Sequence, residues 1–489
     1  MMGSTARLAP PRQITIGTAC TGSAADVLSF HALASAYQEH IPDFDAAYIF
    51  NCESNSNKRA WGMELHGLCP DANPHCCWFT DINALAGGKA LCCKHAEEKP
   101  QGCPVGTVDI FVCATSCKDF AKANHSRHKR QGGESARTLS GMNAYLDRYR
   151  PPIFLFENVD SIDDSASGMS DMDIVLTTWQ SMGYECQRVV VQSKEFGIPA
   201  SRKRMLAFGF QTESNAALDF AERPLRDVFS SLRSLIRVCQ RKPSCASKVL
   251  LASDHPALQR ELARRQRLRV AAKASGQTGY NVGKAMEVAK QHGVQWGSFP
   301  PSVTLAADAW FQTLTRQQQD VVTYSLKVNP DKLLFRDVGQ SFGQARVSTL
   351  AVSADGTEHC AAAVLPNQMM MVFADGHPHR LLLGREALVL QGFPSGKQSL
   401  SELIEKTPEA LMADLAGNMV STPVMLAMAM AAISSVSWRA LPREQAPTAT
   451  ADACAAAWNV FKTLTSGSPP ASSSGGSQSP DPAQKRQRR

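Results

Sequence analysis

The chain has 489 residues and a formal net charge of +7, with 44% hydrophobic and 19% charged residues. This composition is that of a globular protein with a sizeable core, and the length favours more than one domain. No apolar run reaches the roughly 20 residues of a bilayer span, and the N-terminus lacks the apolar core of a secretory signal, so we expect no membrane association. The modest positive charge permits a polyanionic partner without requiring one.

Residues 14–210 alternate apolar runs with helical patterns. The apolar runs predict strands at 14–18, 46–50, 108–112, 152–156, 184–192 and 204–210, and the helical patterns include 24–39, 55–66 and 170–182. Unbroken apolar strands that alternate with helices indicate an α/β fold with a mostly parallel sheet covered on both faces. The last two strands leave no room for a helix between them, so we expect an antiparallel hairpin at the edge of the sheet.

The character of the sequence changes along the chain and predicts five segments. Irregular polar sequence with a basic stretch at 259–273 follows the predicted sheet, an apolar pattern returns at 381, and the end is rich in Ala, Ser, Pro and Gly. We therefore predict an N-terminal tail (1–13), a main domain (14–214), a second domain (215–380), a segment completing the main domain (381–437) and a disordered basic tail (438–489).

Polar residues follow three of the predicted strands. "TACTGSAAD" (18–26) is a turn that contains Gly22, and such a turn lets a ligand approach the backbone and the N-terminus of a helix. Glu53 ends the second strand, where an acid of a Rossmann-like sheet can bind ribose hydroxyls, and Asp81 follows a further apolar run, where it can accept a hydrogen bond from an adenine amino group. An ordinary turn and two helix-capping acids explain the same residues.

Position distinguishes Cys117 from the other cysteines. Fifteen cysteines without a secretory signal indicate a reducing compartment, in which most thiols pack like small hydrophobes. Cys117 lies in a loop just past the strand at 108–112, where open α/β sheets place their chemistry. Basic residues follow it, namely Lys118, Lys122, His125, Arg127, His128, Lys129 and Arg130. Nearby positive charge favours the reactive thiolate, so a nucleophile and a packing thiol both fit this position.

Charged residues also end two later strands. Glu157 leaves the apolar strand of "FLFENVD", where a carboxylate can acquire a raised pKa and donate a proton. Arg202 and Arg204 occupy alternate positions, which places them on one face of a strand, and arginines so placed can hold a carboxylate or a phosphate. On the predicted helix at 259–273, Arg260, Arg264 and Arg267 share a face that suits either phosphate contacts or solvent.

The segment around Asp81 is rich in potential metal ligands. These are Cys69, His75, Cys76, Cys77, Cys92, Cys93, His95 and Cys103. The spacings match no common zinc finger, and no Cys-x-x-Cys pair occurs. We therefore expect thiols that pack or lie at the surface and no metal site, with a structural zinc as the alternative.

The order of these elements resembles the cytosine-5 DNA methyltransferase family. The motifs that carry the resemblance are the Gly turn, the acid, Asp-Ile, the loop cysteine, "FENV", Arg-x-Arg, "LQGFP" and "AGN", within residues 14–210 and about 381–430. The resemblance implies a Rossmann-like methyltransferase fold with a target-recognition domain at 215–380. It implies a transferase that moves a methyl group from S-adenosylmethionine to carbon 5 of a flipped cytosine in double-stranded DNA.

The resemblance also assigns roles to residues. Cofactor binding falls to Thr21, Gly22, Glu53, Ser54, Asp81, Ile82 and Asn418. Cys117 is the nucleophile that adds to carbon 6 of the base, and Glu157 contacts ring nitrogen 3. Arg204, together with Arg202, orients the base and Glu157. Covalent addition of a thiolate breaks the aromaticity of the pyrimidine, which divides one difficult step into easier ones.

Some positions depart from the family's pattern. Ser116 and Lys118 replace the usual proline and glutamine beside the nucleophile, Ala200 replaces a glutamine, and Ala24 replaces a common glycine. All residues with a bond-making role are kept, so we expect an active, divergent enzyme. A tRNA cytosine-5 methyltransferase and a catalytically weak DNA-binding regulator are the alternatives.

The termini bear on localisation. "KRQRR" at 485–489 is typical of a nuclear signal or a phosphate-binding tail, and Arg7 and Arg12 in an acid-free N-terminus allow an organelle transit signal. We expect a nuclear protein with a role in epigenetic regulation by DNA methylation.

Overall fold

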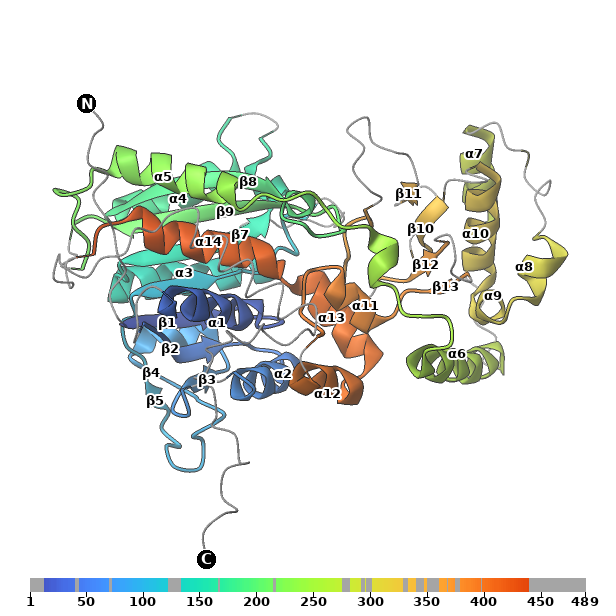
Figure 1. The fold of residues 1–489 in the computed structure, drawn as a ribbon, viewed down its shortest axis with the longest axis horizontal. Helices are drawn as coiled ribbons and strands as arrows, with labels where there is room; N and C mark the ends of the chain where they lie inside the picture. The colour runs from blue at the N-terminus through green and yellow to red at the C-terminus, as the bar shows by residue number, and fades with distance from the viewer. Residues whose placement is uncertain are drawn as a thin grey trace, which may run out of the picture.

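The computed structural model places a large sheet with helical layers at one end and a smaller antiparallel sheet with helices at the other (Figure 1). It describes residues 13–438 except 40–43, 70–72, 122–132, 166–167, 214–216, 275–281, 292–294, 296–300, 329–332, 340–346, 350–359, 367, 374–378 and 397. The predicted tails, including Arg7, Arg12 and "KRQRR", lie outside the described residues apart from Gln13 and Trp438.

The large sheet has seven strands in the order β3-β2-β1-β6-β7-β9-β8. Its strands are β1 (Gln13–Ala19), β2 (Asp45–Cys52), β3 (Cys77–Phe79), β6 (Ile110–Cys113), β7 (Ile153–Val159), β8 (Tyr184–Gln192) and β9 (Lys203–Gln211). β3, β2, β1, β6 and β7 run parallel, and β9 is antiparallel to β7 and β8. The predicted Rossmann-like α/β class is confirmed, as is the antiparallel pair, in which β8 forms the edge and β9 lies inside it.

Two apolar layers cover the sheet because its strands alternate their side chains between the faces. Ile153 and Leu155 of β7 pack into one cluster, and Phe154 and Phe156 pack into the other. α1 (Ala25–Gln38), α5 (Leu225–Val238) and α14 (Thr422–Ser435) cover the first face, whereas α3 (Glu134–Tyr149) and α4 (Asp171–Ser181) cover the second (Figure 1). The first face therefore needs residues from near both ends of the described chain.

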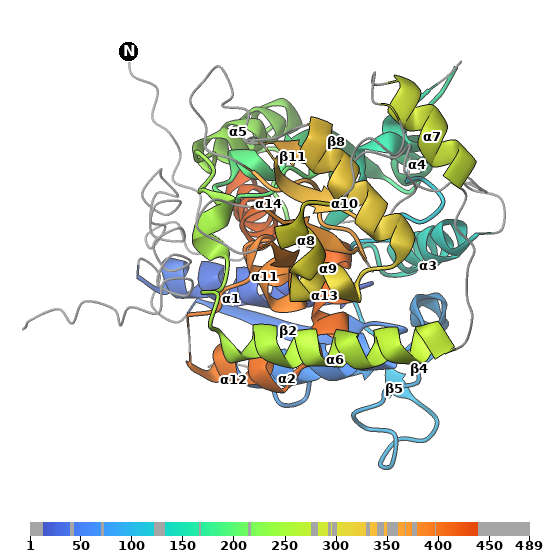
Figure 2. The same cartoon turned by 90° about the vertical axis from the view of Figure 1, so that its right-hand side faces the viewer.

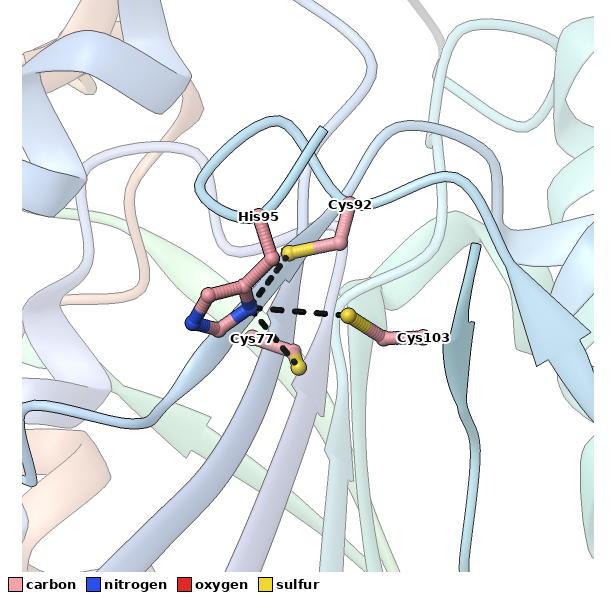
Figure 3. Close-up of side chains that lie close together, drawn as sticks. All are labelled: Cys77, Cys92, His95 and Cys103. Atoms are coloured by element: carbon pink, nitrogen blue, oxygen red, sulfur yellow. Dashed lines mark hydrogen bonds between the residues drawn. The ribbon is translucent and has the colours of Figure 1, made fainter. Parts of the chain in front are cut away.

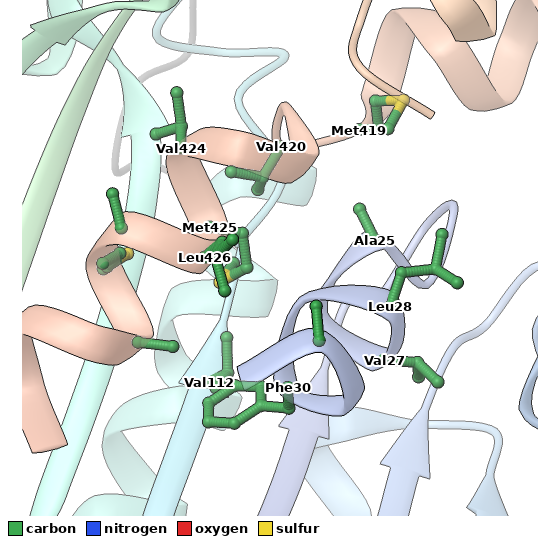
Figure 4. Packing of buried hydrophobic residues seen from close by; sticks show 14 of the residues in the cluster. Ala25, Val27, Leu28, Phe30, Val112, Met419, Val420, Val424, Met425 and Leu426 are labelled. Carbon is green, nitrogen blue, oxygen red and sulfur yellow. The ribbon is translucent and has the colours of Figure 1, made fainter. Parts of the chain in front are cut away.

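α14 is the most deeply buried helix of this layer. Every one of its residues is buried, and it lies beside α1 on the same face of the sheet, with its Met425 and Leu426 in one cluster with Leu28 and Phe30 of α1 (Figure 4). Together with α13 (Glu409–Asn418) it forms a run that is apolar and long enough to cross a membrane, and this run is longer than the sequence patterns indicated. Its most apolar stretch is 94% buried within the protein. This run therefore serves as the core of the fold.

The smaller sheet, in the order β11-β10-β12-β13, lies in the chain between α5 and α11. Its strands are β10 (Leu333–Asp337), β11 (Val347–Thr349), β12 (Met370–Val372) and β13 (Arg380–Leu381), and the helices are α6 (Pro256–Ala274), α7 (Val282–Gln291), α8 (Val303–Ala307), α9 (Ala309–Thr313) and α10 (Arg316–Val328). Residues of the helices α6 to α10, of β12 and of β13 share a separate apolar cluster, and this part of the chain lies to one side of the large sheet (Figures 1 and 2). Phe335 of β10 and Met370 and Val372 of β12 instead belong to the cluster on the first face of the large sheet. The predicted boundary at 215 between the main domain and the second domain stays a prediction. The helix α5 follows this boundary in the chain but packs on α14 of the large sheet.

The remaining elements connect these layers. α2 (Ser56–Gly67) follows β2, and η1 (Ile82–Gly87), β4 (Lys89–Ala90) and β5 (Cys103–Pro104) lie between β3 and β6. The chain returns from β13 through α11 (Gly384–Val389) and α12 (Gln398–Lys406) to α13. α12 and α13 both contact α2, which brings the end of the chain to the beginning of the sheet.

A buried ion pair fixes the return of the chain at β13 and α11. The Arg380 guanidinium, which is fully buried, donates to both oxygens of Glu386 at 2.7 and 2.8 Å. Glu386 also accepts the backbone N–H groups of Leu383 (2.8 Å) and Leu251 (2.7 Å), so its carboxylate is fully engaged. Because charged groups lose their hydration when buried, each partner depends on the other.

Glu386→Gln should therefore destabilise the protein strongly, because it leaves the Arg380 charge buried and unpaired. We expect a loss of roughly 3–5 kcal/mol of unfolding free energy, measured from urea denaturation midpoints. Glu402→Gln on the exposed side of α12 serves as control and should stay within about 0.5 kcal/mol of the wild type. Adding Arg380→Met should recover part of the loss, and equal midpoints for all variants would contradict the assignment.

Asp26 in the first turn of α1 is a buried carboxyl group. Burial raises its pKa to about 7, against weaker opposing hydrogen bonds from its own backbone, from Thr18 and from Val27. Between about pH 4 and pH 7 the folded chain holds a proton that the unfolded chain has lost. The stability contributed by this proton is complete below about pH 4 and disappears as the pH rises through 7.

Asp26→Asn should remove this pH dependence, because the amide is neutral at every pH. Between pH 5 and pH 8 the wild type should lose roughly 3 kcal/mol of stability relative to the variant. Urea midpoints of both proteins at the two pH values measure the difference, with the exposed Asp147→Asn as control. Parallel profiles for wild type and Asp26→Asn would show that Asp26 is already ionised at pH 5.

Candidate functional site

A cavity of about 1150 Å³ lies at the carboxyl ends of β1, β2, β6 and β7. Of the residues proposed for the site, Gly22, Glu53, Ser54, Asp81, Ile82, Cys117, Glu157, Arg202, Arg204 and Asn418 all line it. Thr21 does not line it, and its carbonyl oxygen instead accepts the N–H of Ala24 at 2.9 Å within the turn. The structure therefore brings together residues that are up to about 400 positions apart in the chain.

The turn after β1 has an unusual backbone. Cys20, Gly22 and Ala24 have φ angles of 57°, 54° and 56°, in the left-handed region. Glycine adopts this conformation freely, whereas Cys20 and Ala24 each hold it at a cost of about 1–2 kcal/mol. A Cβ at Gly22 would lie 3.7 Å from the Asn418 carbonyl oxygen, so conformation rather than space favours glycine there. Strained backbone of this kind gathers at functional sites.

Glu53 ties this turn to the end of β2. One oxygen accepts the N–H of Gly22 at 3.0 Å, and the other accepts the N–H of Asn55 at 2.8 Å. Its side chain is 8% exposed and borders the cavity. A carboxylate has about four acceptor positions, so two remain for hydroxyl donors of a ligand.

Asp81 and Ile82 form another wall. Asp81 caps η1 by accepting the N–H of Asn83 at 3.1 Å, and it pairs with Arg137 of α3 at 3.2 Å. Partial burial opposes ionisation, but the Asn83 hydrogen bonds and the Arg137 charge together lower the pKa of Asp81. Ile82 is 4% exposed. The capping interpretation of Asp81 is therefore correct, and its position on the cavity allows a ligand contact as well.

The loop of Cys117 is held by polar contacts on both sides. The Asn158 amide donates to the Thr115 carbonyl (3.2 Å) and hydroxyl (3.0 Å), and the Ser116 N–H donates to the Thr138 hydroxyl at 3.1 Å. Cys117 itself is half-buried on the cavity, whereas burial raises the pKa of the Cys113 thiol well above its usual range. Cys113 is thus a packing thiol, and Cys117 is open to a ligand.

A second anchor joins the loop to α3. The buried Asp119 carboxylate accepts the Ser135 N–H at 2.8 Å, and the Asp119 N–H donates to the Ser135 hydroxyl at 3.0 Å. Gly133, the residue before α3, provides no side-chain cap, so Asp119 caps this helix from the loop. Lys118 pairs with Glu134 at 2.6 Å on the exposed side. These contacts hold the loop without the stiffening proline that Ser116 replaces.

Glu157 and the two arginines meet opposite this loop. The Arg204 Nε lies 2.8 Å from a Glu157 oxygen, and both side chains are largely buried. Arg202 precedes β9 instead of lying in it, and it donates to the Val364 carbonyl (2.8 Å) and twice to the Gly417 carbonyl (3.0 and 3.1 Å). Burial, and then the like charge of Arg204, lower the pKa of Arg202 to about 9, so it stays protonated at neutral pH.

The "AGN" segment closes the cavity from the end of α13. The Asn418 amide donates to the backbone and side-chain oxygens of Asp414 at 2.8 Å, and Asp414 pairs with Lys58 of α2 at 3.0 Å. A Cβ at Gly417 would lie 2.0 Å from the Pro366 backbone nitrogen. Glycine is therefore needed at 417, where the segment of Leu365 and Pro366 crosses the end of α13.

Sequence patterns did not identify several of these contacts. Arg137, Thr138 and Lys58 lie on helices without a recognisable motif, and their roles depend on which loop packs against them. The basic run at 122–130 lies outside the described residues. On α6, Arg260 pairs with Glu405 (2.9 Å) and Arg264 with Glu261 (2.7 Å), which favours a bracing role for this face.

Comparison with known proteins gives one family match. Residues 89–434 match the family described as C-5 cytosine-specific DNA methylase. A protein named DNA (cytosine-5-)-methyltransferase DMT5 of Cryptococcus neoformans is 26% identical over 443 residues, which cover 86% of this chain and 17% of that protein. The DNA (cytosine-5)-methyltransferase PliMCI of Paracentrotus lividus is 28% identical over 26% of this chain and 8% of its own length.

The chain thus spans less than a fifth of the length of these two relatives. Among solved structures, the S. pombe Dnmt2 methyltransferase matches with a TM-score of 0.40 and 14% identity, covering 85% of this chain and 97% of the other.

The contacts of Asp119 lead to a prediction about the Cys117 loop. Asp119→Ala should remove the cap of α3, cost about 1–2 kcal/mol of stability and free the loop. Hydrogen exchange should become faster at residues 117–121 and 134–138. Glu134→Ala in the same turn is the matched control, since it removes only the exposed pair with Lys118 and should cost about 0.5 kcal/mol or less. Equal exchange in both variants would show that Asp119 does not hold the loop.

Proposed function

We propose that this chain, which belongs to the C-5 cytosine-specific DNA methylase family, methylates carbon 5 of cytosine in double-stranded DNA and that the cavity is its active site. The family uses S-adenosylmethionine as methyl donor. The observation that carries the proposal is the convergence of Cys117, Glu157, Arg204 and Asn418 on the cavity that also holds Gly22 and Glu53.

The cofactor half of the cavity fits an adenosyl group with an attached amino acid. Glu53 has free acceptor positions for ribose hydroxyls, Asp81 for an adenine amino group, and Ile82 offers an apolar surface to the ring. The Gly22 turn and Asn418 lie close together, and we propose that they enclose the methionine part. When bound, the cofactor supplies an electrophilic methyl group.

We propose that the other half of the cavity activates the base. The Cys117 thiolate adds to carbon 6, which breaks the aromatic system and places electron density on carbon 5. Glu157, held by Arg204, donates a proton or a hydrogen bond to nitrogen 3 and so relieves the charge that develops on the ring. After carbon 5 takes the methyl group it loses its proton, and elimination of the Cys117 thiolate restores the aromatic ring.

Arg202 has a positioning role in this scheme. Its guanidinium is committed to the Val364 and Gly417 carbonyls, so it acts on the base through Arg204 and through the segments it joins.

A base in duplex DNA must leave its stack to reach Cys117, at a cost of a few kcal/mol. We propose that the part of the chain between α5 and α11 contacts that DNA.

We also propose a nuclear location with a role in epigenetic regulation, which the basic sequence "KRQRR" supports. Imaging a tagged chain with and without residues 485–489 tests the location.

Methyl transfer tests the proposal directly. Tritium from labelled S-adenosylmethionine should enter duplex DNA, and Cys117→Ala should lower the rate by about 10³-fold or more. Cys245→Ala, a partly buried thiol outside the cavity, is the matched control and should keep the activity. Glu157→Gln should slow transfer by about 10²–10⁴-fold. Label in tRNA alone, or in neither nucleic acid, would overturn the DNA proposal.

Duplex DNA that contains 5-fluorocytosine identifies the nucleophile. Fluorine at carbon 5 cannot leave as a proton does, so the adduct should persist and map to the peptide that contains Cys117. Cys117→Ala should form no adduct while binding the cofactor as the wild type does, because the proposal assigns Cys117 to the base and other residues to the cofactor. An adduct on another cysteine would contradict the assignment.

A further inference from the structure

Four potential metal ligands converge outside the cavity, between β3 and the β4–β5 pair. The Nδ1 atom of His95 lies 3.4 Å from the Cys92 sulfur, 3.5 Å from the Cys103 sulfur and 3.6 Å from the Cys77 sulfur. The four ligand atoms all lie within 4.8 Å of one another. Figure 3 shows the three sulfur atoms turned toward the same imidazole nitrogen.

These distances match the geometry of a tetrahedral metal. With Zn–S near 2.3 Å and Zn–N near 2.05 Å, a tetrahedral angle places sulfur and nitrogen about 3.6 Å apart. All three observed separations lie within about 0.2 Å of that value. A hydrogen-bonded cluster without a metal has no reason to hold three thiols at one distance from a single nitrogen that has only one lone pair or one proton.

Backbone contacts build the site independently of the side chains. Cys92 bridges to Phe79 of β3, the Cys93 N–H donates to the Trp78 carbonyl at 2.9 Å, and Ala90 pairs with Cys103. Gly102 has a φ of 88°, and a Cβ there would lie 2.6 Å from the Ala90 carbonyl oxygen. Glycine is thus needed at this position to bring Cys103 beside the strand.

The surroundings suit a bound thiolate cluster. The Trp78 N–H donates to the Cys92 sulfur at 3.3 Å, which is the kind of contact that orients and stabilises a metal thiolate. Cys92 and Cys103 are buried, and Cys77 and His95 are partly buried. Four ligands complete a tetrahedral shell and leave no open position, as in structural zinc sites.

We propose that Cys77, Cys92, His95 and Cys103 form a structural zinc site of the Cys₃His type. The expectation of packing thiols for this segment rested on the absence of a Cys-x-x-Cys pair, whereas Cys92-x-x-His95 supplies the short-range pair with a histidine in the second place. The zinc joins β3 to the strap of residues 89–104. Asp81 and η1 lie in the chain between Cys77 and this strap, so the metal steadies the wall of the cavity that holds Asp81 and Ile82.

Metal analysis tests the site without reference to methyl transfer. The full chain, purified and dialysed against metal-free buffer, should retain about one zinc per molecule by mass spectrometry of the metal. Cys92→Ser and Cys103→Ser should each lose most of it. Cys93→Ser is the matched control, because this exposed neighbour lies outside the cluster, and it should keep the zinc.

Cobalt substitution keeps the test valid even if the serine variants fold poorly. Wild-type protein loaded with Co²⁺ should show the intense visible bands of a tetrahedral thiolate site, and added Zn²⁺ should remove them. Wild-type protein that binds neither metal, or zinc retained by a Cys92→Ser, Cys103→Ser double variant, would overturn the proposal. Because these readouts do not involve methylation, a failure of the proposed enzyme activity would leave their outcome unaffected.

Discussion

The buried guanidinium of Arg202 holds the cavity together. It joins the start of β9 to the carbonyl groups of Val364 and Gly417, which are 162 and 215 residues further along the chain. Backbone pairing reinforces this junction, since Ala361 exchanges hydrogen bonds with Pro199 and Ser201. A buried cation needs hydrogen-bond acceptors, so the two carbonyl groups stabilise the charge of Arg202 inside the protein. The segments around Val364 and Gly417 are thus fixed at the edge of the cavity, beside Glu157 and Arg204.

Much of the fold follows from local sequence patterns. Unbroken apolar runs such as "PIFLF" and "RMLAFGF" can only be buried on both faces, which predicts a covered sheet and its strands. The helices at α1, α2 and α4 also agree with their predicted ranges to within one or two residues. The place of β9 between β7 and β8 is less evident, because a hairpin pattern does not say which of its strands meets the rest of the sheet.

The site could be predicted only where a residue's position along a strand determines its direction. Glu53 and Glu157 lie at strand ends, and parallel strands bring such ends to one edge, so these residues could be placed in advance. Arg202 could not, because its partners come from distant segments and its alternation with Arg204 suggested a shared strand face. Which four of the cysteines and histidines between 69 and 103 come together could not be predicted for a similar reason, since Cys77 reaches the pair of Cys92 and His95 through the pairing of residues 92–93 with β3.

The end of α13 links the two halves of the cavity. In the half proposed for the cofactor, Asp414 pairs with Lys58, and the Asn418 carbonyl lies beside the Gly22 turn. In the half proposed for the base, the neighbouring Gly417 carbonyl accepts hydrogen bonds from Arg202, whose charge lies next to Arg204 and Glu157. Gly417 is packed too closely against Pro366 for this segment to shift alone. Any movement of α13 must therefore displace contacts in both halves of the cavity.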